Sequence, residues 1–553
     1  MKNLLILSSL VLVAPASAQS ALLREDDPSP DGTPGQVISG IGSTNVNAAG
    51  GASCSLTTSG PNGSVSQIWG NLSGGANSLL REESTIGNLE QGSFELRFGT
   101  SASGVIYGAS STNTVTGATA LDNVWFNDTL LLNEGEQPAG SPDFWTFAEN
   151  QDITTAGVPY CRAGISATAG GSTDRRGIYM GSPLTAIYFT GDLLPNMPLP
   201  LSTTAVDADF RISADGSQSI LAVDLDSSTT DDAAVALNQA GLVLGGTLVR
   251  EGEAVPPSIG GIGDDWSSFD FFGITDAGEY MFTGNTNGPS ASNEFIVRNG
   301  SIWAREGDML GGELLSGSIE GASMNASGEI AFVWSIDVGP GAPDEALFLD
   351  DQLLLQEGDA VDWDGDGVID PAITIQSFTG FNTVTLADNG SVYFTADVDV
   401  NGTTLEGYFV LPGSQIGTSY CMANVNSTGV STDLRVIGSD VASLNDVTLV
   451  ADNIPLNQFG YFLNSQTQGF LPNPNNSQGN LCVLGNIGRY NAQLFNSGSS
   501  GTGSLILDLT NTPQPLGAVS IVAGETWNFQ CWHRDLNPAP TSNFSQGVSI
   551  LFQ

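Results

Sequence analysis

The chain has 553 residues and a formal net charge of −45, from 59 acidic residues against 14 basic ones. Lys2 is its only lysine, so every other permanent base is an arginine. Such a chain could not neutralise phosphates, which excludes nucleic acid as a partner and argues against binding to anionic membranes. Its 40% of apolar residues predicts a folded protein, since disordered chains of high charge are poor in them.

Residues 1–18 have the pattern of a secretory signal peptide. Lys2 gives a positive start, residues 4–13 form a short apolar run, and Ala16-Ser17-Ala18 fits a small-residue cleavage site. The apolar run is too short to span a bilayer, and the alternative is a buried N-terminal strand. The pattern favours export to the periplasm, cell surface or medium, without membrane insertion.

Seven repeats follow in residues 19–414. Each has a turn that ends in glycine, because a tight turn of this kind needs a positive φ. The marker glycines are Gly50, Gly104, Gly157, Gly216, Gly278, Gly328 and Gly390, at steps of 54, 53, 59, 62, 50 and 62 residues. Four residues later the chain places Cys54, Gly108, Cys161, Ile220, Phe282, Phe332 and Phe394. We expect this position to be in the core, on the strand after the turn.

The second half of each repeat reads as a hairpin. Residues 294–297 and 301–304 are joined by Asn299-Gly300, a strong hairpin signal. Residues 123–126 with 129–132, and 345–349 with 352–355, repeat the pattern, so each unit offers about four strands. In residues 330–334 apolar side chains point both ways, which predicts a sheet covered on both faces. Small repeated sheets of this kind are typical of a β-propeller.

The two ends of the repeat region predict that the ring closes. Residues 21–25 resemble the last strand of a repeat, at residues 78–82, whereas the seventh repeat stops at Pro412-Gly413 without such a strand. We therefore expect the N-terminal strand to pair with residues 408–411 and to complete a seven-bladed β-propeller. An open β-solenoid, the alternative, would not need this borrowed strand.

One repeat carries a recognisable signature in full. The run from Asn325 through Gly328 to Phe332 resembles the tandem-repeat family of secreted bacterial proteins named for its Asn-x-x-Gly-x-x-x-Phe signature, and the other repeats keep the glycine and vary the rest. The resemblance covers roughly residues 21–413. It implies secretion and a repeat fold, and it carries over no catalytic residue.

Residues 415–553 lack the repeat pattern, and their sequence predicts a separate all-β module. They contain about eight alternating strands, which suits a β-sandwich. The run from Trp527 to Asp535 is similar to the end of a C-terminal module found on secreted proteins of environmental bacteria. Because Cys421 and Cys482 share this module in an exported chain, we expect them to form a disulfide. Cys54, Cys161 and Cys531 are then left as small buried residues.

The sharpest motif is an acidic loop at residues 362–370. Asp362, Asp364 and Asp366 follow the Asp-x-Asp-x-Asp-Gly plan of a calcium loop, Val368 would offer its carbonyl oxygen, and Asp370 stands at position nine. Position twelve departs from the plan, because Ile373 stands there instead of glutamate. The loop is a candidate Ca²⁺ site, and an acidic surface turn is the alternative.

Other reactive groups are few. His533 is the only histidine, and although Asp535 would share its strand face, no Gly-x-Ser-x-Gly elbow accompanies them. Acidic residues end every hairpin, among them Glu25, Glu83, Glu134, Glu306 and Glu357. One role for these acids is to accept hydrogen bonds from backbone N–H groups in the turns. The alternative is that two of them act as a pair to hydrolyse glycosides. The sequence therefore favours a secreted or cell-surface non-enzymatic binding or scaffold protein, with glycan or envelope components as candidate partners; the alternative is a polysaccharide-directed hydrolase.

Overall fold

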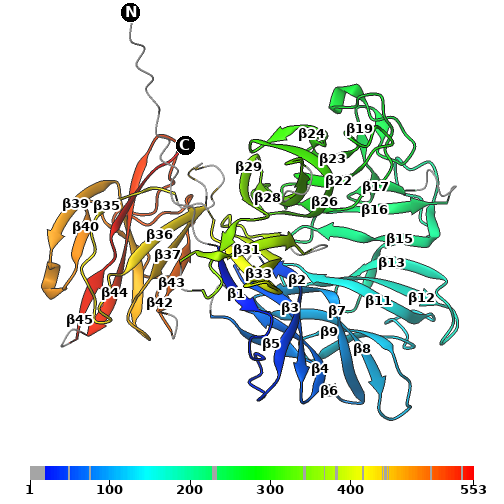
Figure 1. Cartoon of the computed structure of the whole chain (residues 1–553), viewed down its shortest axis with the longest axis horizontal. Coiled ribbons are helices and arrows are strands. Elements are labelled where there is room, and N and C mark those ends of the chain that lie inside the picture. The colour runs from blue at the N-terminus through cyan, green and yellow to red at the C-terminus, as the bar shows by residue number, and fades with distance from the viewer. Residues whose placement is uncertain are drawn as a thin grey trace, which may run out of the picture.

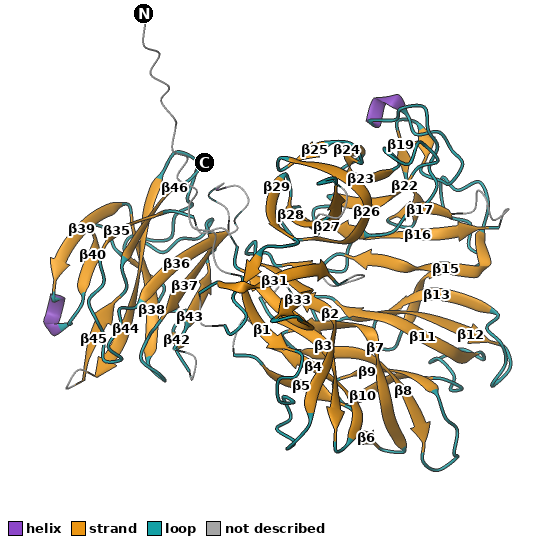
Figure 2. Ribbon diagram, in the orientation of Figure 1, coloured by secondary structure: helices purple, strands orange, loops and turns teal. Residues whose placement is uncertain are grey.

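The computed structural model describes residues 19–553 except 48–49, 74–75, 227–232, 340–343, 366–367, 380–383, 414–415, 439, 441, 443–444, 446, 499–500 and 537–539. The signal-peptide prediction therefore lies outside the described residues. The described chain is all-β, with the short 3₁₀ turns η1 (Pro257–Ile259) and η3 (Pro474–Asn476) and no α-helix (Figure 2). It accordingly offers no helix with the length and apolar character needed to cross a membrane.

The repeat region is built from small antiparallel sheets, as its hairpin signals predict. The first three sheets are β2 (Val37–Val46), β3 (Ala52–Gly60), β4 (Gly63–Gly70) and β5 (Ser78–Glu82); then β6 (Thr85–Ile86), β7 (Leu89–Ser101), β8 (Gly104–Asn113), β9 (Leu121–Phe126) and β10 (Thr129–Asn133); then β11 (Phe144–Ile153), β12 (Pro159–Ser166), β13 (Arg175–Met180) and β14 (Thr185–Phe189). In each sheet the strands pair in chain order, so every sheet is a meander.

The next three sheets continue this plan. They are β15 (Leu201–Ile212), β16 (Ser219–Leu225), β17 (Ala233–Leu237) and β18 (Ala240–Gly241); β21 (Phe272–Ile274), β22 (Tyr280–Asn285), β23 (Glu294–Arg298) and β24 (Ser301–Arg305); and β25 (Met309–Leu310), β26 (Glu313–Met324), β27 (Ile330–Ile336), β28 (Glu345–Leu349) and β29 (Gln352–Gln356). A two-stranded ribbon, β19 (Val243–Leu244) with β20 (Thr247–Leu248), lies between the fourth and fifth sheets in the chain.

The seventh sheet joins the two ends of the repeat region (Figure 1). Its order is β1 (Ser20–Arg24), β34 (Thr403–Leu411), β33 (Val392–Val400), β31 (Asp370–Phe378) and β30 (Ala360–Val361), with β32 (Val384–Leu386) also on β33. Ala21 pairs with Phe409 and Leu23 with Tyr408. The predicted pairing of the N-terminal strand with the last repeat is confirmed.

The marker glycines have the backbone conformation that the sequence predicts. All seven have positive φ, from 74° at Gly390 to 149° at Gly104. Four residues later, the side chains of Cys54, Cys161, Ile220, Phe282, Phe332 and Phe394 are all fully buried. Asn299 and Gly300 both have positive φ, as the hairpin signal requires.

Each sheet is covered on both faces by its neighbours. On β27, Ala331 and Val333 belong to a core shared with the seventh sheet, whereas Ile330, Phe332 and Trp334 belong to one shared with the fifth. The inner strands contact one another in a closed cycle, β2, β7, β11, β15, β21, β26, β32 and back to β2. The arrangement is propeller-like.

The C-terminal module is a second all-β unit, drawn beside the repeat region in Figure 1. One sheet holds β35 (Thr418–Cys421), β46 (Gly547–Leu551), β44 (Thr526–Leu536), β38 (Phe459–Ser465), β41 (Gly488–Arg489), β42 (Phe495–Asn496) and β45 (Pro540–Phe544); another holds β36 (Asp433–Gly438), β37 (Val447–Asp452) and β43 (Gly503–Ile506); β39 (Thr467–Pro472) and β40 (Asn480–Leu484) pair as a hairpin. Side chains of the larger sheets, such as Leu449 and Phe529, meet in one core.

The predicted disulfide is present in this module. Cys421 and Cys482 are bonded, with their Cα atoms 6.1 Å apart. Cys54, Cys161 and Cys531 are free and buried, in agreement with their prediction as core residues.

Candidate functional site

The acidic loop brings three of its predicted ligands together. One carboxylate oxygen from each of Asp362, Asp364 and Asp370 lies within 4.8 Å of the other two. Val368 is in the same loop with an exposed side chain, and Asp366 lies outside the described residues. An all-oxygen set of this size suits a hard cation such as Ca²⁺. The residues present therefore fit the ion that the motif implies.

Hydrogen bonds within the loop hold two of these carboxylates in place. The N–H of Gly365 donates to Asp362 Oδ1 at 2.9 Å, and the N–H of Trp363 donates to Asp370 Oδ2 at 2.9 Å. Gly365 has a φ of 77°, which its missing side chain permits. Ile373, at the position where a calcium loop has glutamate, instead pairs with Val400 inside the seventh sheet. The loop thus ends directly in strand β31.

The loop is fastened to the closing strand β1. Asp362 is fully buried, and its Oδ2 accepts a hydrogen bond of 2.6 Å from the Ser20 hydroxyl. Its carbonyl oxygen accepts from the N–H of Ala21 at 2.9 Å. Arg24 donates to the Trp363 carbonyl oxygen at 3.1 Å and lies over the Trp363 ring at 5.8 Å. The candidate metal site and the attachment of the N-terminal strand therefore share residues.

The acids at the hairpin ends bond the backbone. In five sheets a glutamate after the outermost strand accepts a hydrogen bond from a backbone N–H of the strand that pairs with it, or of the residue just before that strand. The pairs are Glu25 with Glu406 (3.2 Å), Glu83 with Ser66 (2.6 Å), Glu134 with Asp122 (3.1 Å), Glu306 with Asn293 (3.2 Å) and Glu357 with Asp344 (2.9 Å). The repetition follows from the repeat itself, and it supports the reading of these acids as backbone partners.

His533 lies in a buried polar network of the C-terminal module. Its Nε2 is 2.8 Å from the Thr432 hydroxyl, and its Nδ1 is 2.9 Å from the Arg534 carbonyl oxygen. Burial lowers its pKa. Asp535 accepts from the N–H of Ser427 and of Leu536. Both ring nitrogens are engaged within the protein, as expected for a structural histidine.

A second set of acids, one buried and two half-buried, was not singled out by the sequence. Glu294, Glu345 and Glu406 each lie on the strand that pairs with the outermost strand of the sheet (β24, β29 and β1), and each accepts from a backbone N–H of the next sheet, at Ile319 (3.4 Å), Phe378 (2.8 Å) and Ile41 (2.7 Å) respectively. Burial raises the pKa of Glu294 and of Glu406 to about 7 and also raises that of Glu345. These glutamates join neighbouring sheets, and their shared position in the repeat was the signal that could have revealed them.

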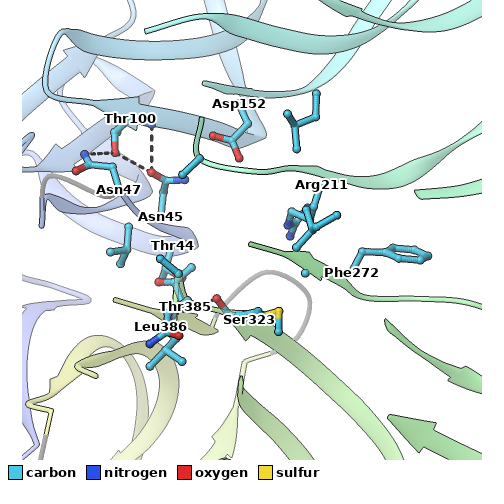
Figure 3. Close-up of a pocket in the computed structure, with 18 of the residues that line it drawn as sticks. Thr44, Asn45, Asn47, Thr100, Asp152, Arg211, Phe272, Ser323, Thr385 and Leu386 are labelled. Carbon is cyan, nitrogen blue, oxygen red and sulfur yellow. Dashed lines mark hydrogen bonds between the residues drawn. The ribbon is translucent and has the colours of Figure 1, made fainter. Parts of the chain in front are cut away.

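A cavity of about 220 Å³ lies where the inner strands meet (Figure 3). No sequence motif indicated it. Its charged wall comes from Arg97 on β7, Asp152 on β11 and Arg211 on β15. Burial raises the pKa of Asp152 to about 6, although hydrogen bonds from the Ile153 N–H and the Tyr160 hydroxyl and the charge of Arg97 act in the other direction. The cavity lining thus combines two arginines with three acids, since Asp276 and Asp388 also contribute to it.

Comparison with known proteins identifies no family. No protein-family model matches the chain, and neither does any curated protein. Among solved structures, a puromycin-hydrolysing peptidase of Mycobacterium tuberculosis is similar over 80% of this chain and 62% of its own, with 11% identity and a TM-score of 0.33. Prolyl oligopeptidase B of Galerina marginata is similar over 76% of this chain and 56% of its own, with 9% identity and a TM-score of 0.29.

A third solved structure is also similar. A gluconolactonase of Xanthomonas campestris matches over 72% of this chain and 98% of its own, with 12% identity and a TM-score of 0.21. This chain spans less than two thirds of the length of either peptidase. At these TM-scores the matches transfer no activity, so the function is argued from the residues above.

Proposed function

We propose that this chain is a secreted, non-enzymatic binding or scaffold protein, in which a seven-bladed β-propeller of the Asn-x-x-Gly-x-x-x-Phe repeat type carries a C-terminal β-sandwich. Ca²⁺ bound in the loop at residues 362–370 clamps the closure of the propeller. The observation that carries the proposal is the contact of this loop with β1, in which the buried Asp362 accepts from both Ser20 and Ala21.

The physical case for the ion is electrostatic. Three carboxylates within one short loop repel one another, and a divalent cation at their centre would turn repulsion into attraction. Asp362, Asp364, Asp366 and Asp370 would supply carboxylate oxygens and Val368 its carbonyl oxygen. Because Ile373 supplies no carboxylate, we expect a weak extracellular-type site with a Kd on the order of 10⁻⁴–10⁻³ M.

The scaffold role is supported by how the repeated acids are used. Five of these glutamates accept a hydrogen bond from a backbone N–H in their own sheet: Glu25, Glu83, Glu134, Glu306 and Glu357. Such bonds hold the outer hairpins in register, which is a structural task. Glycans or envelope components remain the proposed partners of the acidic surface.

Calorimetric titration with Ca²⁺ tests the proposal on the mature chain. We expect Ca²⁺ to bind the wild type with a Kd in the stated range and not to bind Asp364→Ala. Asp351→Asn, which removes an exposed acid elsewhere in the repeat region, should bind Ca²⁺ as the wild type does. Wild type and Asp364→Ala that behave alike would show that the loop is only an acidic turn. A glycan array run with and without Ca²⁺ then tests the binding role, and N-terminal sequencing of exported protein tests cleavage before Gln19.

A further inference from the structure

The central cavity has a repeating chemical pattern that points to a ligand. The residue five positions before each marker glycine lies at this centre, and the seven residues are Asn45, Gly99, Asp152, Arg211, Gly273, Ser323 and Thr385. All except Gly99 line the cavity. Five of the seven have polar side chains and two are glycine. Their strand neighbours Val384 and Leu386 belong to the core between the sixth and seventh sheets, although they also reach the cavity wall. The strand alternation therefore turns a polar side chain toward the cavity in five of the seven repeats.

Arg211 is the cationic group of this ring. In the described part of the chain its guanidinium donates one hydrogen bond, from Nη1 to the Phe210 carbonyl oxygen at 3.0 Å. A guanidinium has five N–H donors in a planar fork, which matches a carboxylate. In a protein of net charge −45, an arginine that faces the central cavity is a specific positive feature.

Asp152 lies on the neighbouring strand and is held in one orientation. Its carboxylate accepts from the Ile153 N–H at 2.8 Å and from the Tyr160 hydroxyl. It also fills the space left by the absent side chain of Gly99, because a Cβ there would collide with it. Figure 3 shows Asp152 and Arg211 on the opposite side of the cavity from Thr44 and Thr385. Asp152 is thus a fixed acceptor on the strand next to that of Arg211, and Arg97 is the cation that acts on its carboxylate.

The other side of the ring offers neutral hydrogen-bonding groups. Asn45 Oδ1 accepts from the N–H and the hydroxyl of Thr100, which leaves the Asn45 amide N–H₂ facing the cavity side. The Ser323 hydroxyl oxygen accepts from the Leu386 N–H at 3.1 Å, so its proton can be donated elsewhere. The Thr385 hydroxyl donates to Thr44 at 3.1 Å and keeps acceptor capacity.

Two other acids that line the cavity already accept hydrogen bonds from the backbone. Asp276 accepts from the Asp215 N–H at 2.8 Å, and Asp388 accepts from the Ala326 N–H at 2.9 Å, so both join neighbouring sheets. The volume of about 220 Å³ is below the usual range for drug-sized ligands, which limits the occupant to a small molecule.

We propose that the central cavity binds a small hydroxylated carboxylate, such as a sugar acid. Its carboxylate lies on the Arg211 guanidinium, one of its hydroxyl groups donates to Asp152, and other hydroxyls bond Asn45, Ser323 and Thr385. This inference does not depend on Ca²⁺ in the acidic loop, because the two sets of residues are separate.

The test is a calorimetric titration of the full mature chain with galacturonate, gluconate, lactate and citrate, and with galactose as the uncharged counterpart of galacturonate. We expect at least one of these carboxylates to bind the wild type. Where galacturonate binds, galactose should bind at least tenfold more weakly. Arg211→Gln should lower the affinity for the bound carboxylate at least tenfold. Arg489→Gln, which removes an exposed arginine of the C-terminal module, should bind as the wild type does.

Two further variants keep the test decisive if Arg211→Gln does not fold. Arg211→Lys keeps the charge but loses the fork, and Asp152→Asn keeps the shape but loses the anionic acceptor; each should weaken binding of the hydroxylated carboxylate by several-fold. The proposal is overturned if no carboxylate of the panel binds the wild type at millimolar concentration, or if folded Arg211 and Asp152 variants bind as tightly as the wild type.

Discussion

The carboxylate of Glu406 accepts a hydrogen bond of 2.7 Å from the backbone N–H of Ile41, and this bond joins the seventh sheet to the first across 365 residues of sequence. Glu294 and Glu345 make the equivalent bond between the fifth and sixth and between the sixth and seventh sheets. A glutamate on the strand next to the outermost one is therefore a recurring connector between sheets. Its burial has consequences for stability, because a buried carboxylate is costly to ionise.

We predict that the protein loses stability as the pH rises from about 4.5 to about 7. Burial raises the pKa of Glu294 and of Glu406 to about 7, above the value of about 4.3 for an exposed glutamate. In that pH range these two glutamates bind more protons in the folded protein than in the unfolded chain, so their contribution to the free energy of unfolding falls with rising pH. Each glutamate should contribute about 1 kcal/mol after allowance for solvent screening. Thermal unfolding at pH 5 and pH 8 measures it.

The variant Glu406→Gln separates this effect from general charge repulsion. It cannot ionise but keeps an oxygen to accept from Ile41, so its melting temperature should change less between pH 5 and pH 8 than that of the wild type. Glu90→Gln removes the same charge from an exposed site and should keep the wild-type pH dependence. Equal slopes for all three proteins would contradict the prediction.

The elements of the repeat region could be predicted because they depend on local chemistry. A marker glycine with positive φ, an apolar side chain four residues later and an Asn-Gly hairpin are each short-range features, and the structure has them where the sequence placed them. The closing strand was predictable for another reason: residues 21–25 repeat the pattern of residues 78–82. The similarity between repeats therefore indicated a long-range strand pairing that local sequence chemistry alone does not reveal.

The central cavity could not be predicted by the same route. Asp152 and Arg211 share their strands with other charged residues, so neither stands out locally, and only superposition of the repeats shows that both stand five residues before a marker glycine. The Asp152 pKa and its contact with Gly99 depend on neighbouring sheets, which the local pattern does not contain. The buried connector glutamates escaped notice for the same reason.

Ring closure predicts a large effect for a single side chain on β1. Leu23 is buried against Ile38, Ile41 and Tyr408, so it contacts both the first and the seventh sheets. Leu23→Ala should lower the free energy of unfolding by about 2–4 kcal/mol, and deletion of residues 21–25 should cost more because it also exposes the edge of β34. Denaturant unfolding measures both. Leu516→Ala, at a leucine that is 97% exposed, should change nothing. An unchanged midpoint after the deletion would contradict the closed ring.

The disulfide predicts a selective effect on the C-terminal module. The Cys421–Cys482 bond joins residues 61 positions apart, and the chain-entropy estimate gives about 4 kcal/mol for a loop of that length. Replacement of both cysteines by alanine should lower the melting temperature of this module and leave that of the repeat region unchanged, as scanning calorimetry would show. A reducing agent should reproduce the loss in the wild type and add nothing to the double variant. A loss of the same size in the repeat region would contradict this assignment.

Calcium should protect the closing strand against hydrogen exchange. The N–H of Ala21 donates to the Asp362 carbonyl oxygen, and the N–H of Asp362 donates to the Gln19 carbonyl oxygen, so opening of β1 requires the acidic loop to release it. An ion bound only to the closed loop stabilises it by RT ln(1 + [Ca²⁺]/Kd), which is about 1.4 kcal/mol at 10 mM Ca²⁺ for a Kd of about 1 mM. The Ala21 amide should therefore exchange about tenfold more slowly in 10 mM Ca²⁺, as measured by mass spectrometry or NMR.

Two comparisons make this last prediction specific. Amides of β38 in the C-terminal module are remote from the loop in sequence and should exchange at the same rate with and without Ca²⁺. In Asp364→Ala, which removes one ligand and leaves the bonds of Asp362 to Ser20 and Ala21 in place, the protection of Ala21 should disappear. Protection that persists in this variant would place the ion elsewhere, and protection spread equally over β1 and β38 would indicate a general effect of ionic strength on a protein of net charge −45.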